Sequence, residues 1–249
     1  MGVGFVGSGC LFIDRLASDG SQTGYKRMGN STKFAIKPDA EKKERISKQC
    51  DSYGQVLGTV VVPKPTTLSV TMDEWDRETV AMALFGDAAV KDISAGSVTD
   101  EQITAHHDAV SFLAHRDVSS VVVTNSDGST TYTAGDDYTV DTERGAITVL
   151  SSGAISNGDS LLVDYSYGAE KYVEINGSTS PIIKCRFLLD GINQETGKKC
   201  RVEVLEAVLS PSGEGDFLAD DFSALEFEAT LNTPDGAGAP YTVNYYDGV

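Results

Sequence analysis

The residues best suited to chemistry are three histidines, His106, His107 and His115, and a carboxylate pair, Asp220 and Asp221. Adjacent histidines on a strand point to opposite faces, so a metal shared by them would need distant ligands. Paired carboxylates can hydrolyse a glycosidic bond, but nothing separates this pair from a solvated loop. We expect ordinary surface histidines and no enzymatic activity.

Two other segments resemble ligand loops without meeting their requirements. "GVGFVGSG" at the start of the chain follows no strand and lacks the Lys-Ser/Thr ending of a phosphate-binding loop, so we expect a flexible arm. The carboxylates of "NSDGSTTYTAGDDYTVD" do not follow the spacing of a calcium loop, and hairpin turns explain them better. The sequence therefore predicts neither a metal nor a cofactor.

Charge and composition narrow the class of protein. The net charge of −17 opposes a nucleic-acid ligand held by its phosphates. No apolar run approaches the ~18 residues of a membrane span, and no secretory signal is recognisable. Cysteines stand at positions 10, 50, 185 and 200 without metal-ligand spacing. We expect a cytoplasmic site of synthesis and free thiols.

Positive charge is concentrated early in the chain and negative charge late. Residues 26–48 carry eight bases and three acids, whereas Arg201 is the only base beyond position 200, against ten carboxylates. The two regions could neutralise each other within one copy or set the register between copies. The bases that we predict to contact another subunit are Lys37, Lys42, Lys43, Arg45 and Lys48.

Most of the chain has the pattern of antiparallel strands. β-branched runs such as "GQVLGTVVVP" and "SSVVVTN" are separated by turn sequences such as "NSDGS" and "TERG". One helix is expected over about 72–85, with Thr71 or Asp73 as N-cap and Gly86 as the stop. Residues 100–116 fit a helix or a strand equally. The predicted fold is mainly β, an antiparallel sandwich or barrel with one flanking helix.

The order of these elements resembles the tail tube proteins of tailed bacteriophages. The similarity runs through "GFVGSGCLFIDRL", "GNSTKFAIKPDAEKKER", "SVTMDEWDRETVAMALFG" and "DFSALEFEATLNTPDGAGAPYTVNYYD". It implies a sandwich subunit that forms stacked hexameric rings around a channel for DNA ejection. On this basis residues 1–97 and 173–249 are the tube core, 38–54 an extended inter-subunit loop, and 98–172 an inserted β-rich region.

The resemblance also implies partners and a location. The subunit would bind further copies of itself and would meet sheath, tail terminator, baseplate and tape-measure proteins in the virion after assembly in the bacterial host cytoplasm. Phage DNA would pass without specific binding, and no membrane is involved. In "LEFEATLN" the residues Glu226 and Glu228 alternate with Leu225 and Phe227, so they are candidates to line the channel, unless that face meets solvent outside the tube.

Two other classes of protein fit part of the pattern. A type VI secretion-like tube would share the architecture but is usually built from smaller subunits. A monomeric immunoglobulin-like adhesin or binding module would share the strands, but the apparent lack of a secretory signal and the charged segment 38–54 argue against it.

Overall fold

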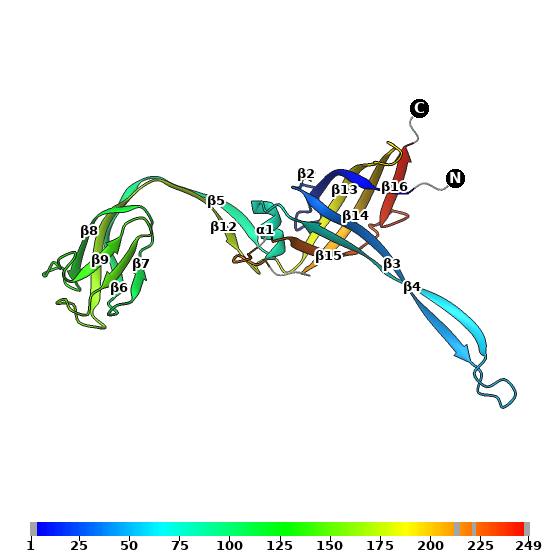
Figure 1. Ribbon diagram of the computed structural model, residues 1–249, viewed down its shortest axis with the longest axis horizontal. Coiled ribbons are helices and arrows are strands. Elements are labelled where there is room, and N and C mark those ends of the chain that lie inside the picture. Colours follow the sequence, from blue (N-terminus) through cyan, green and yellow to red (C-terminus); the bar gives the residue numbers. More distant parts are fainter. Residues whose placement is uncertain (1–3, 212–214, 221–222, 247–249) are drawn as a thin grey trace. The chain divides into compact units, whose positions relative to one another are not determined.

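The computed structural model describes residues 4–211, 215–220 and 223–246, and these form two compact units. Unit 1 comprises Met1–Ala88 with Ile175–Val249, and unit 2 comprises Ala89–Glu174 (Figure 1). The sequence had suggested boundaries at 97/98 and 172/173, so the unit boundaries of the structure lie nine residues earlier and two residues later.

Unit 1 contains one eight-stranded antiparallel sheet with the order β2-β1-β13-β14-β15-β4-β3, and β16 also pairs with β14. The described strands do not close into a barrel, and the mainly β, sandwich-like class is confirmed. Its strands are β1 Gly7–Arg15, β2 Lys26–Arg27, β3 Ser31–Ile46, β4 Val56–Met72, β13 Ile183–Asn193, β14 Lys199–Pro211, β15 Leu225–Leu231 and β16 Tyr241–Tyr246.

The expectation of a flexible arm at the N-terminus is wrong from Gly7 onward. Residues 7–15 pair in unbroken antiparallel register with β13, from Gly7 opposite Asn193 to Arg15 opposite Cys185. The small residues that suggested flexibility permit this close pairing. A Cβ atom on Gly9 would lie 2.6 Å from the carbonyl oxygen of Asp190, so the glycine serves the approach of two backbones.

Along β15 and the inner part of β4, every second residue points into the core of unit 1, as the alternation of apolar and polar residues in the sequence predicts. Leu225, Phe227, Ala229 and Leu231 on β15 are buried, whereas Glu226 and Glu228 are exposed. This confirms the predicted alternation. On the adjoining β4, Leu68, Val70 and Met72 are fully buried in the same cluster as Phe187 of β13, so the central strands are fixed by one shared core.

The single helix of the described residues, α1, is shorter than predicted and begins later, spanning Arg77–Ala83. The N-cap is Asp76, whose Oδ1 accepts hydrogen bonds from the amides of Glu78 and Thr79, both at 2.8 Å. Thr71 and Asp73 were wrong candidates because β4 continues to Met72, which lies opposite Leu225 of β15. Residues 71 and 72 pair with β15, so they cannot form the first turn of a helix, although the sequence has a capping pattern there.

The helix ends in a left-handed residue that is not the expected glycine. Phe85 adopts φ 51°, and its amide and that of Gly86 donate to the carbonyls of Met82 and Ala81, which is the Schellman arrangement. Gly86 is required for another reason. A Cβ atom there would lie 2.3 Å from the carbonyl oxygen of Asn176.

Unit 2 contains two three-stranded sheets, ordered β6-β11-β8 and β7-β10-β9. Residues 100–116 contribute strand rather than helix, since β6 ends at Thr104 and β7 follows at Val110. Leu161, Val163 and Ile147 are buried in a core of its own. The strands are β6 Gly96–Thr104, β7 Val110–Phe112, β8 Val118–Asn125, β9 Tyr138–Asp141, β10 Ala146–Val149 and β11 Ser160–Tyr167; β5 Asp87–Ile93 pairs separately with β12 Glu170–Asn176.

Substituting Gly86→Ala should lower the free energy of unfolding of unit 1 by ~1–3 kcal/mol, because the added methyl group overlaps the Asn176 carbonyl. Trp75 is the only tryptophan and lies in unit 1, so its fluorescence during denaturation reports this unit. Gly238→Ala is the control, since a Cβ atom there meets nothing within 4 Å. Equal stability of the two variants would contradict the close approach.

Candidate assembly surface

The predicted inter-subunit loop at 38–54 is instead the outer half of strand β3 together with most of the turn of a long hairpin. β3 and β4 pair from Ser31 opposite Met72 to Ile46 opposite Val56, and Figure 1 shows the ribbon extending beyond the rest of unit 1. The polar residues form a strand because the β-branched run of β4 supplies its hydrogen-bonding partner. We call residues 39–64 the outer hairpin.

The outer hairpin has no third strand among the described residues. β15 pairs with β4 only from Thr67 to Met72, so the ribbon beyond that point is two-stranded. Isolated two-stranded ribbons are marginally stable in water because neither face is buried. A third strand or a packed surface would therefore stabilise this part of the chain.

Apolar side chains on both faces of the outer hairpin are left in water. Val60 and Val61 point to opposite faces, and each is 62% exposed. Ile46, Val56 and Leu57 near the turn are about half exposed as well. An uncovered stripe on a strand with free edges is a site for association with another chain.

The basic residues predicted as contacts lie on this hairpin and are largely unneutralised. Residues 42–50 carry four bases and one acid, Glu44. Lys42 forms an ion pair with Glu44, but Lys43, Arg45 and Lys48 have no ion pair with any residue that the structure describes. Each of the predicted contact residues is exposed, and Lys37 lies nearer the sheet, opposite Thr67.

The turn of the hairpin, residues 47–55, is held by its own hydrogen bonds. Ser47 is buried, and its hydroxyl lies 2.7 Å from that of Ser52. The amide of Ser47 donates to the carbonyl oxygen of Gln55 at 2.7 Å, and the amide of Gly54 donates to the carbonyl oxygen of Ser47 at 3.0 Å. Tyr53 projects from this ordered turn and is 77% exposed. No motif in the sequence marks this tyrosine, and its position between two turn residues, Ser52 and Gly54, was the only signal available.

The two lumen candidates lie together on the polar face of the sheet. Glu226 is opposite Thr71, and Glu228 is opposite Ser69. Because Lys37 is opposite Thr67 on the same side of β4, one face carries carboxylates on β15, hydroxyls on β4 and a base on the edge strand β3. The part of the face formed by these residues is therefore mainly polar and is not suited to packing as a second hydrophobic core.

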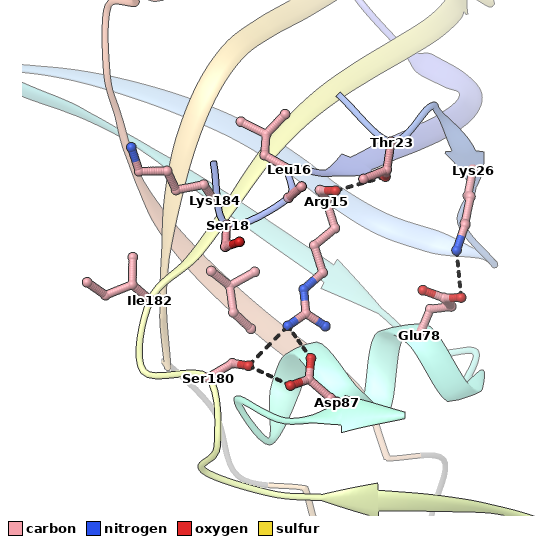
Figure 2. A pocket seen from close by; sticks show the side chains of 12 residues that line it. Arg15, Leu16, Ser18, Thr23, Lys26, Glu78, Asp87, Ser180, Ile182 and Lys184 are labelled. Carbon is pink, nitrogen blue, oxygen red and sulfur yellow. Dashed lines mark hydrogen bonds and ion pairs between the residues drawn. The ribbon is translucent and has the colours of Figure 1, made fainter. Parts of the chain in front are cut away.

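A cavity of about 760 Å³ lies in unit 1 beside Arg15. Figure 2 shows the guanidinium directed at Asp87 and Ser180, with Nη2 to Oδ1 at 2.7 Å and Nη2 to Oγ at 3.3 Å. The other bases at the rim are also paired, Lys26 with Glu78 and Lys184 with Glu206. No lining base is therefore free to hold an anionic ligand, and these contacts tie β1 to the segments around α1 and β13.

Three of the partly buried or buried titratable side chains of unit 2, His107, His115 and Tyr165, contact other residues of the same unit. The His115 ring stacks on Tyr167 at 3.6 Å between centroids. The hydroxyl of Tyr165 donates to Glu101, and burial together with this hydrogen bond raises the pKa of Tyr165. His107 lies 2.8 Å from the carbonyl oxygen of Ile155. The described residues hold no cluster of three metal-ligating side chains, and Asp221 of the carboxylate pair lies outside them.

One family model, described as "Protein of unknown function UCP028589", matches residues 4–237. The chain belongs to this family. No curated protein matches it. Within the described ranges, none of the helical structure is long and apolar enough to cross a membrane. The family description names no activity.

Proposed function

We propose that the protein is a structural subunit of a phage tail tube, which acts by assembling with copies of itself and not by catalysis. The observation that supports this most is the outer hairpin. It exposes valines on both faces and three bases, Lys43, Arg45 and Lys48, that form no ion pair with a described residue, and its turn is held by hydrogen bonds. Such a ribbon is suited to completion by another molecule, and a second copy is available at high concentration during assembly.

The edges of the unit 1 sheet support lateral association. β3 is a terminal strand of the sheet, and among the described strands β16 pairs with β14 alone. Exposed strand edges promote association unless they are covered. Pairing an edge of one copy with a different edge of the next is a heterologous contact, which closes into a ring when the rotation is suitable. Hexameric rings are the form that the resemblance to tail tube proteins implies.

Stacking of such rings would be the task of the outer hairpin. A contact between different surfaces of successive rings does not close, so it continues into a tube. The basic residues of the hairpin would face the acidic surface of a chain whose net charge is −17. The tube would reside in the virion, assembled in the host cytoplasm, with sheath, terminator, baseplate and tape-measure proteins as further partners.

The polar face of the sheet is our candidate for the channel wall. Glu226 and Glu228 project from it and are exposed. Carboxylates along a channel would repel the phosphates of passing DNA and prevent adsorption. Cryo-electron microscopy of assembled tubes tests this assignment, and Glu226 on the outer wall would contradict it.

Reversing three bases of the outer hairpin, Lys42, Lys43 and Arg45→Glu, should prevent tube formation, because the arm would then repel the acidic surface that it meets. The measurement is negative-stain microscopy of the purified protein together with its elution volume. Trp75 fluorescence should show unchanged unfolding of unit 1, since exposed substitutions usually change stability by less than ~0.5 kcal/mol.

The matched control reverses three exposed bases of unit 2, Arg116, Arg144 and Lys171→Glu, and alters the net charge equally. This variant should still assemble. Tubes of normal length from the hairpin variant would refute the role of its bases. Loss of assembly in both variants would show that total charge, and not the hairpin, limits association.

A further inference from the structure

We infer that the turn of the outer hairpin in one copy inserts into a particular cavity of a second copy, formed by β1, the segment before β3 and the segment before α1. This inference rests on the proposed function and adds the acceptor surface. It concerns the turn, residues 47–55, and a cavity of about 570 Å³ lined by Gly9–Leu11, Arg27–Ser31 and Glu74–Asp76.

The turn and the cavity lie at opposite ends of unit 1. Figure 1 shows the turn at the far end of β3 and β4, whereas β2 and α1, which flank the cavity, lie at the other end. A projection at one end and a hollow at the other cannot meet within one copy. They can meet between copies arranged head to tail, and each contact then leaves a free projection and a free hollow for further growth.

The cavity offers a mixture of surfaces that suits a tyrosine. Trp75 is half-buried at its wall, and its indole nitrogen donates to the carbonyl of Ser223 at 2.8 Å, so the ring is held in place. The volume lies in the usual range for sites that enclose a small organic group. Tyr53 presents an apolar ring with a polar tip, the type of side chain that anchors many interfaces.

Charge favours the same pairing. The lining of the cavity includes the carboxylates Glu74 and Asp76 against one base, Arg27. The turn carries one base, Lys48, and one acid, Asp51, and a second base, Arg45, lies two residues before the turn on β3. Neither base forms an ion pair with a described residue, so both can meet the carboxylates of the cavity. Opposite charges around a central aromatic contact give orientation as well as affinity.

The native thiols allow a direct test on the full chain. Cys50 lies exposed in the turn, and Cys10 lines the cavity and is partly exposed. Cys185 and Cys200 are buried, and burial raises the pKa of Cys185 to about 12, so it is unreactive at neutral pH. A short bis-maleimide, which adds one thiolate to each of its two rings, should link Cys50 of one copy to Cys10 of the next and give a ladder of covalent oligomers.

The single variants Cys10→Ser and Cys50→Ser should each abolish the ladder, while microscopy still shows assemblies. A product that stops at the dimer and persists in Cys10→Ser would indicate contact between two turns and would overturn the inference. Assemblies without any Cys10–Cys50 link would also overturn it, but would leave the proposed function standing. Absence of assemblies would contradict both.

Discussion

The architecture depends on one constraint: a β-strand has two faces and two edges, and each must be covered or solvated. β4 meets this requirement in its second half, where Leu68, Val70 and Met72 are buried and β15 pairs with its edge. In its first half the same strand continues as one side of a two-stranded ribbon, with Val60 and Val61 in water. The need to cover that half is the physical basis of the proposed assembly.

Because the exposed and buried halves belong to one strand, the outer hairpin is anchored directly in the core of unit 1. Its register is set where β4 is buried, since a slip of one residue would expose Leu68 and Val70. Docking of the turn on another copy would therefore engage a strand pair whose register is already set and not an unpaired loop. Less ordering entropy is lost when such an element binds. Unit 2 has a separate core and contributes no residue to the proposed contact.

The sequence predicts features that depend on local period and misses those that depend on competition between elements. Alternation along β15 placed Glu226 and Phe227 on opposite faces correctly. The strand character of residues 39–46 was missed, because their partner is a valine run beyond a turn and pairing is not encoded in either segment alone. The helix start was misplaced because the capping pattern near Thr71 cannot reveal that β4 extends to Met72.

The central claim is that surfaces left open in one chain are completed by other copies of that chain. Sedimentation velocity of the purified protein over a wide range of concentrations tests this most directly, because it reports mass without depending on any variant. The account predicts species far larger than 26.4 kDa, with mass increasing in steps of a ring. A single species at 26.4 kDa at every concentration would contradict it.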